Sequence, residues 1–214
     1  VLLLAGVTWV GCAAVLAQDA VPPAEVLFPD RMSFYERVAR GSKLPEDMQF
    51  YNVDRELVPA ASIFEAPYTI IASGCLTCGQ YRTTYPDVEA LYRDYKDKGV
   101  DFYFIYQTLM HPENHGYVMA YSMEERFLQL DVAIDEYRTR VPWILDTFDN
   151  KFKAFTGVPN GEFIFDSDGV IVHAEPRSEA PSLRDRLEAL VGPVEHPTSR
   201  ADLDLPDIER LGLG

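Results

Sequence analysis

The chain has 214 residues, of which 47% are hydrophobic and 25% are charged, so it is long enough to bury one sizeable core. Acidic residues outnumber basic ones by 34 to 19, which gives a formal net charge of -15. Such a surface would repel the phosphates of a nucleic acid, and the composition therefore argues against that class of partner.

The first 17 residues carry no charge and are mostly apolar. This stretch is short for a membrane span, and Val15-Leu16-Ala17 has the small-x-small ending of a secretory signal. We therefore expect residues 1–17 to be a cleaved signal peptide, which would place the protein outside the cytoplasm, in a periplasm or secreted. The alternatives are an uncleaved membrane anchor and a lipid anchor on Cys12.

Residues 18–47 begin with a proline-rich run that is typical of a linker and end in a short amphipathic helix. The main domain is expected over residues 48–192. It opens with two short strands, 48–53 and 57–58, which predict an N-terminal hairpin. An apolar strand then starts at Pro67 and leads into two cysteines.

Helical and strand patterns alternate through the rest of the domain. Residues 85–98 and 122–140 have apolar side chains at helical spacing, and Ser122 with Glu125 forms a capping box. Between them, the run 100–106 is β-branched and aromatic, as is typical of a buried central strand. The remaining expected elements are a strand over 142–145, a short helix over 148–155, a hairpin of strands 162–165 and 170–173, and a closing helix over 183–191.

This order of elements predicts an α/β fold with a mixed central β-sheet flanked by helices. After the closing helix, residues 193–214 form an acidic tail that contains prolines. We expect this C-terminal tail to be poorly ordered.

Cys75 and Cys78 have the C-x-x-C spacing and lie between the apolar strand and a long helical pattern. The N-terminus of a helix carries partial positive charge and unpaired N–H groups, and both stabilise a thiolate. The pattern therefore indicates a dithiol redox site, where a thiolate attacks a disulfide, a peroxide or another soft electrophile. The second cysteine then resolves the mixed intermediate. Spacing alone favours Cys75 as the attacking residue, and the order stays open.

Other interpretations of the pair are a structural disulfide and a metal site. A structural disulfide adds most stability when it closes a long loop, and a bridge between Cys75 and Cys78 would close almost no loop. A zinc site would need a second pair of ligands, and no cysteine follows Cys78. His115 or His173 with a cysteine would suit copper, so a non-enzymatic binding module or copper chaperone is the alternative to an enzyme.

Two sets of residues carry a resemblance to a known family. The first is Gly74, Thr77-Cys78, Val100-Asp101-Phe102, Tyr106 and His111-Pro112; the second is Pro142, Leu145-Asp146-Thr147, Asp149-Asn150, Pro159 and Asp168-Gly169-Val170-Ile171-Val172. Together they resemble the iodothyronine deiodinases, over about residues 48–175. That family has a thioredoxin-like fold and selenocysteine at its reactive position. Residues 48–67 also resemble the N-terminal hairpin of peroxiredoxin-like proteins.

The resemblance implies a thioredoxin-like fold, with Cys78 at the reactive position and Cys75 as the resolving residue. It also implies that His111 is catalytic, which suits an imidazole that titrates near physiological pH. Thr77 and Pro159 would position the substrate. In thioredoxin-like proteins a cis proline lies beside the active cysteine, and Pro159 before a strand and hairpin resembles that element.

We therefore predict an exported thiol-dependent oxidoreductase of the thioredoxin-like, deiodinase-like type. The expected partner is a thiol or disulfide electron donor or a small-molecule electrophile. No cofactor and no metal is expected, and a homodimer is compatible with the sequence. The alternative reaction is that of a deiodinase-like reductive dehalogenase or a peroxidase.

Overall fold

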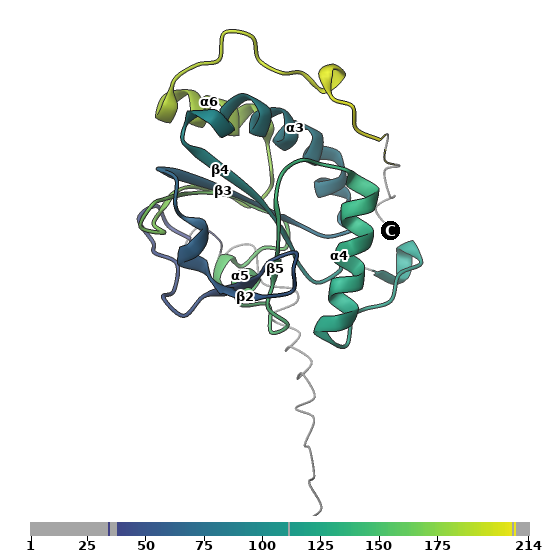
Figure 1. Ribbon diagram of the computed structural model, residues 1–214. Coiled ribbons are helices and arrows are strands. Elements are labelled where there is room, and N and C mark those ends of the chain that lie inside the picture. The colour runs from purple at the N-terminus through teal and green to yellow at the C-terminus, as the bar shows by residue number, and fades with distance from the viewer. Residues whose placement is uncertain (1–33, 35–37, 111, 207, 209–214) are drawn as a thin grey trace, which may run out of the picture.

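The computed structural model describes residues 34, 38–110, 112–206 and 208 (Figure 1). The expected signal peptide, most of the expected linker and short helix, and His111 lie outside these residues. Within the described part of the chain, no helix is both long enough and apolar enough to cross a membrane.

Among the described residues, seven strands form one mixed sheet in the order β2-β1-β5-β4-β3-β6-β7 (Figure 1). The strands are β1 Gln49–Tyr51, β2 Leu57–Pro59, β3 Tyr68–Gly74, β4 Val100–Tyr106, β5 Trp143–Asp146, β6 Glu162–Asp166 and β7 Ile171–Glu175. The strands β3, β4 and β5 are parallel, and a hairpin pairs antiparallel with each side of this central group. The predicted α/β class, with a mixed sheet and an N-terminal hairpin, is confirmed.

Helices cover both faces of this sheet. They are α3 Gly79–Tyr95, α4 Met123–Tyr137, α5 Lys151–Thr156 and α6 Ala180–Val191. The helices α3, α4 and α6 bury their apolar sides in one core, which includes Tyr81, Phe104 and Trp143. The helix α5 packs through Phe152 into a second core on the other face. Because both faces are covered, β3 and β4 consist almost entirely of buried residues.

The helix α3 begins at Gly79, directly after Cys78, and not at Tyr85, where the expected helix started. Its first turns bury Tyr81 and Tyr85 against the sheet, and this packing extends the helix backwards. Pro86 lies inside the helix. A proline has no N–H, so it removes one helical hydrogen bond, and the buried tyrosines around it hold the helix together.

The start of α4 follows the predicted capping box in part. The Ser122 hydroxyl accepts a hydrogen bond from the N–H of Glu125 at 3.2 Å, as expected. The Glu125 carboxylate, however, accepts from the N–H of Tyr121 at 2.6 Å. The helix ends at Tyr137, earlier than expected, because Arg138 adopts a left-handed conformation with a φ of 49°.

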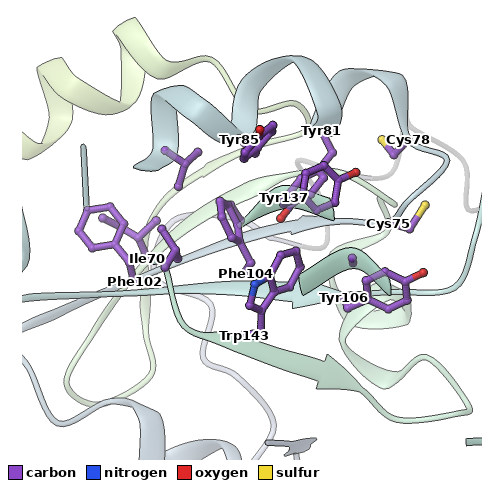
Figure 2. Packing of buried hydrophobic residues seen from close by; sticks show 14 of the residues in the cluster. Ile70, Cys75, Cys78, Tyr81, Tyr85, Phe102, Phe104, Tyr106, Tyr137 and Trp143 are labelled. Carbon is purple, nitrogen blue, oxygen red and sulfur yellow. The ribbon is translucent and has the colours of Figure 1, made fainter. Parts of the chain in front are cut away.

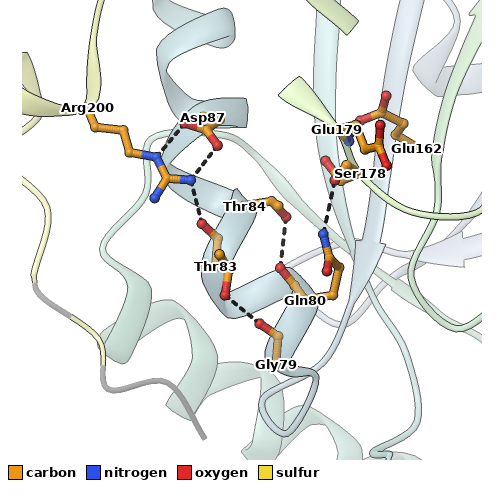
Figure 3. A network of polar contacts seen from close by, with 9 residues as sticks. All are labelled: Gly79, Gln80, Thr83, Thr84, Asp87, Glu162, Ser178, Glu179 and Arg200. Atoms are coloured by element: carbon orange, nitrogen blue, oxygen red, sulfur yellow. Dashed lines mark hydrogen bonds and ion pairs between the residues drawn. The ribbon is translucent and has the colours of Figure 1, made fainter. Parts of the chain in front are cut away.

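The C-terminal tail was expected to be poorly ordered, but its described residues lie along α3 (Figures 1 and 3). Asp94 of α3 accepts hydrogen bonds from the N–H and the hydroxyl of Thr198, at 3.0 and 2.6 Å. Arg200, in the short 3-10 helix Arg200–Asp202, donates to Asp87 at 2.5 Å. The acidic composition of the tail gave no sign of this, because its anchoring side chains are a threonine and an arginine.

Candidate active site

The two cysteines lie at the edge of the sheet where its parallel strands end (Figure 2). β3 ends at Gly74, β4 ends at Tyr106 and β5 ends at Asp146, which brings these three residues to one edge. Cys75 follows β3 directly, and Cys78 is the residue that precedes the first turn of α3. This edge of an open α/β sheet is where ligand and catalytic sites usually form.

Gly74 fixes how closely α3 approaches the end of β3. A Cβ atom at this position would lie 2.2 Å from Cγ of Tyr81, so a larger residue would displace that ring. The Tyr81 ring also makes edge-to-face contacts with Phe104 and Tyr137, at centroid distances of 5.2 and 5.4 Å. The cysteine loop is therefore attached to a rigid aromatic core on its inner side (Figure 2).

Both thiols are free, and both are buried: Cys75 is 1% exposed and Cys78 is 7% exposed. Burial, together with a smaller contribution from the nearby Cys75, raises the pKa of the Cys78 thiol to about 12. The backbone amides of Gln80 and Tyr81 and the charge of Lys153 lower that pKa, but they do not offset burial. The expected stabilising effect of the helix N-terminus is present at Cys78, and desolvation exceeds it.

Thr77 connects the cysteine loop to the segment that follows β4. Its Oγ1 donates a short hydrogen bond to the carbonyl of Met110 and accepts one from the Met110 N–H at 3.0 Å. The same oxygen lies 3.5 Å from Sγ of Cys75. This contact brings the residue before His111 to the cysteines. The catalytic role of His111 stays a prediction, because that residue is outside the described part of the chain.

Pro159 does not have the predicted cis geometry, since no cis peptide bond occurs among the described residues. The two isomers of a bond before proline differ little in energy, so the local sequence does not determine which one forms. The place of Pro159 beside the reactive cysteine stays a prediction. Gly161, two residues further on, donates from its N–H to the hydroxyl of Ser73 at 2.7 Å, and Ser73 is two residues before Cys75.

Arg82 also fixes the cysteine loop. Its guanidinium donates to the carbonyl of Leu76 at 3.0 Å and to the carboxylate of Glu136 at 2.6 Å. The Arg82 side chain is only 5% exposed, which makes this a largely buried ion pair. Arg82 thus joins the loop between the cysteines to both α3 and α4.

Two buried charged residues near the site have no role in the functional site predicted from the sequence, although one of them, Asp146, is among the residues that carry the resemblance. Asp146 is 0% exposed and accepts hydrogen bonds from the N–H groups of Phe152 and Lys153, at 3.1 and 3.0 Å. Burial raises the pKa of Asp146 to about 6. Lys153 is 0% exposed as well. The sequence did contain a signal for Asp146, which is a carboxylate at the end of a buried strand. It contained no signal for Lys153.

Within the described residues, no three histidine, cysteine, aspartate or glutamate side chains are grouped so that they could hold a metal ion. A cavity of about 350 Å³ lies between α3, α6 and the C-terminal tail, and Leu91, Arg184 and Arg200 are among its lining residues. The cysteines do not line this cavity.

Together, the sheet order, the flanking helices and the cysteine pair at the β3–α3 junction define a protein with a thioredoxin-like fold. No protein-family model matches the chain, and no curated protein matches its sequence. Solved structures do match it, at low sequence identity.

A thiol:disulfide interchange protein from Bacteroides sp. is 20% identical with a TM-score of 0.57, over 74% of this chain and 94% of that protein. The thioredoxin domain of a thiol-disulfide oxidoreductase from Bacteroides vulgatus is 20% identical with a TM-score of 0.53, over 72% and 98%. A putative thiol:disulfide interchange protein DsbE from Chlorobium tepidum is 12% identical with a TM-score of 0.56, over 72% and 99%. At these identities the similarity shows the fold.

Proposed function

We propose that this protein is a thiol-disulfide oxidoreductase that acts through Cys75 and Cys78. The observation that carries the proposal is the position of two free thiols at C-x-x-C spacing, at the strand-to-helix junction of a thioredoxin-like fold. The dithiol interpretation needs both sulfurs within reach of each other. The two cysteines lie at the ends of one turn, which is closed by a hydrogen bond of 3.2 Å from the N–H of Cys78 to the carbonyl of Cys75.

The proposed reaction has two steps. The Cys75 thiolate attacks one sulfur of a substrate disulfide, whose S–S bond breaks and releases a thiolate, leaving a mixed disulfide on Cys75. Cys78 then loses its proton to solvent and attacks Cys75, which releases the second substrate thiolate. The protein dithiol is thereby oxidised by two electrons and the substrate disulfide is reduced. A thiol donor restores the dithiol by the reverse exchange.

This order of the cysteines is opposite to the one that the deiodinase resemblance implies. The C-x-x-C spacing, which favours the first cysteine as the attacker, supports this order, and burial acts in the same direction by raising the pKa of the Cys78 thiol. Such a thiol is a poor first attacker. It can still resolve a mixed disulfide that is held directly beside it, since proximity raises the effective concentration of the two sulfurs.

Trapping with single cysteine variants tests both the reaction and the order. We expect Cys78→Ser to form a stable mixed disulfide with 5,5′-dithiobis(2-nitrobenzoate) or a disulfide-bonded substrate, and Cys75→Ser to form much less. The double variant is the control for non-specific labelling. If neither single variant forms a mixed disulfide and both retain activity, the proposed function is wrong; trapping only by Cys75→Ser would reverse the order.

Reductive dehalogenation is the second candidate, and the residues that resemble the deiodinases support it. A thiolate at the same position would attack an iodine substituent as a soft electrophile: the C–I bond breaks, the ring carbon takes a proton from solvent, and a sulfenyl iodide forms on the cysteine. The second cysteine then displaces iodide and forms a disulfide, which dithiothreitol reduces. Release of iodide from an iodothyronine in the presence of dithiothreitol tests this candidate. If the protein exchanges disulfides but releases no iodide, the dehalogenase candidate is wrong and only the thiol-disulfide oxidoreductase proposal remains.

We also propose an extracytoplasmic location, which the apolar stretch of residues 1–17 supports. Disulfide exchange proteins act in such oxidising compartments as well as in the cytosol. Fractionation of cells that express the full precursor, followed by N-terminal sequencing of the product, tests this proposal. A cytoplasmic product that retains residues 1–17 would contradict it.

A further inference from the structure

The exposed large hydrophobic side chains of the described residues gather on one part of the molecule. Four of them lie on α4 or in the segment before it, and two lie at the tip of the β1–β2 hairpin. They are Val118, Tyr121, Leu128, Val132, Val53 and Leu57, and they are between 44% and 73% exposed. Single exposed apolar residues are normal on a protein surface, whereas a group confined to one area is typical of a binding site.

The tip of the hairpin lies beside α4 (Figure 1). The Arg55 guanidinium, at this tip, pairs with the carboxylates of Glu124 and Asp131 on α4, at 2.7 and 3.2 Å. It also lies over the ring of Phe127, 5.2 Å from the centroid. The two exposed apolar residues of the hairpin stand two positions to either side of Arg55, so these contacts hold them next to the helix.

The apolar residues of α4 and of the segment before it are also joined. Leu128 and Val132 are four residues apart and therefore share one face of the helix. Nε2 of Gln129 donates to the carbonyl of Val118 at 2.9 Å, which ties the preceding segment to α4. We call the exposed side chains of residues 52–57 and 118–135 the hairpin–α4 surface.

Acidic side chains surround the apolar ones on this surface. Both basic residues of the two ranges are already engaged, because Arg55 is paired with α4 and Arg126 is only 1% exposed. The acidic residues, all of them exposed, are Asp54, Glu56, Glu124, Glu125, Asp131 and Asp135. Two of them share Arg55, and the other four form no ion pair within the described part of the chain. The hairpin–α4 surface is therefore an apolar area with a negative rim.

The charge of the rim selects among the possible occupants. A second copy of the chain would bring two acidic rims together, and the phosphates of an anionic membrane would be repelled in the same way. A segment that carries both apolar and basic side chains matches the apolar area and its rim. Since Leu128 and Val132 form a stripe along a helix, a second helix with its own apolar stripe can pack against them.

We propose that the hairpin–α4 surface is a docking site for a partner protein, which binds through an amphipathic helix with basic residues beside its apolar stripe. This inference goes beyond the proposed function, because none of the residues involved belongs to the dithiol site. The apolar contacts supply affinity, and the acidic rim supplies the preference for a basic partner.

Binding of a designed peptide tests the proposal. The probe is a short, fluorescently labelled peptide of leucine and lysine, with the leucines at helical spacing, and its affinity for the full chain is measured by fluorescence anisotropy. We expect the double variant Leu128→Gln, Val132→Gln to bind about tenfold more weakly, because apolar contacts are lost while the charge is unchanged. Asp135→Asn should weaken binding about threefold at low salt, and this effect should vanish in 0.5 M salt.

The matched control for charge is Asp185→Asn, which removes an exposed carboxylate from α6 and should leave the affinity unchanged. A peptide with the same leucines and lysines in scrambled order should bind the unaltered protein weakly. Val118→Gln, which lies outside the helix, is the second apolar variant and covers the case in which the double substitution destabilises α4. It should weaken binding of the ordered peptide as well.

The remaining outcomes would overturn the proposal. If the apolar variants bind the ordered peptide as tightly as the unaltered protein, net charge alone attracts it. Equal weakening by Asp135→Asn and Asp185→Asn would have the same meaning. Sedimentation that shows a dimer in the unaltered protein and a monomer in the double variant would make a second copy the occupant. Binding to phosphatidylserine vesicles that the double variant loses would make a membrane the occupant.

Failure of this proposal is distinguishable from failure of the proposed function. Cys75→Ser and Cys78→Ser should bind the leucine–lysine peptide with the affinity of the unaltered protein. The double variant Leu128→Gln, Val132→Gln should in turn form the same mixed disulfides with 5,5′-dithiobis(2-nitrobenzoate) in a Cys78→Ser background. A loss of peptide binding in the cysteine variants would contradict a separate docking site.

Discussion

Glu162 is a carboxyl group enclosed by the fold at the start of β6. It is 0% exposed, and its Oε2 accepts a hydrogen bond from the N–H of Glu179 at 3.1 Å (Figure 3). Burial raises the pKa of Glu162 to about 7, and the carboxylates of Glu175 and Glu179 add to the rise, while Ser178 and the Glu179 N–H lower it. Burial therefore favours the protonated form of this side chain, although the hydrogen bond from the Glu179 N–H favours the charged form.

This environment gives stability a defined pH dependence. Glu162 has an ordinary pKa of 4.5 in the unfolded chain and about 7 in the folded one, so the folded state binds the proton more tightly. Its contribution is fully present below pH 4.5 and is lost as the pH rises to 7, by about 3 kcal/mol at most. We expect Glu162→Gln to remove this decline, because the amide can still accept from the Glu179 N–H without a charge.

Urea unfolding at several pH values measures the effect. The free energy of unfolding of Glu162→Gln minus that of the unaltered protein should increase between pH 4.5 and 7 and then stay constant. Taking the difference cancels the titration of Asp146, whose raised pKa of about 6 acts in the same direction. A difference that does not vary with pH would contradict the prediction.

At the scale of elements, α3 connects the active site to the rest of the molecule. Its N-terminus follows Cys78, its inner side packs on the sheet, and its outer side carries the C-terminal tail. Asp94 is the main attachment point on that outer side. It accepts from the N–H and the hydroxyl of Thr198 and from the guanidinium of Arg184 at 2.8 Å, and its side chain is only 3% exposed.

We expect Asp94→Ala to release the tail from α3. The substitution leaves Thr198 and Arg184 without their common acceptor, which should cost about 1–3 kcal/mol of unfolding free energy. Limited proteolysis detects the release, because trypsin should then cut after Arg200 faster than in the unaltered protein. Asp97→Ala, an exposed neighbour, is the control. Equal rates of cleavage in all three proteins would show that the tail does not depend on Asp94.

The elements that the sequence predicted correctly are those with a strong local signal. The strand 100–106 has no breaker and was placed with its observed bounds. The junction at Cys75 and Cys78 was also found, since a strand, a C-x-x-C pair and a helix are adjacent in the chain. The start of α3 was missed because Pro86 and the apolar spacing from Tyr85 onwards both suggested a later beginning.

What the sequence could not predict depends on contacts between distant segments. Lys153 reaches Met110 because α5 follows β5, which pairs beside β4, and a single lysine in a short helical pattern carries no such information. The tail is ordered through Thr198 and Arg200, whose partners lie more than a hundred residues earlier. Thr77 holds the backbone of Met110, a contact that the resemblance did not indicate, and its role toward a substrate stays a prediction.

At the scale of the whole molecule, the dominant property is the net charge of -15. A field of this sign raises the average concentration of cations around the protein and lowers that of anions. Arg82 and Lys153, two cations of this part of the molecule, are enclosed and are 7% and 0% exposed. They act on groups inside the protein more than on an approaching substrate.

The charge should therefore select among small disulfides. We expect the reduced protein to react faster with cystamine, which is positively charged, than with glutathione disulfide, which is negatively charged. Each rate is first divided by the rate at which the same disulfide reacts with a free thiol such as dithiothreitol. The corrected rate for cystamine should then exceed that for glutathione disulfide on the order of tenfold at low ionic strength. It should fall toward one in 0.5 M salt, where screening acts over a few ångströms. A ratio that is unaffected by salt would mean that contacts at the site, and not the field of the whole protein, determine which disulfide reacts.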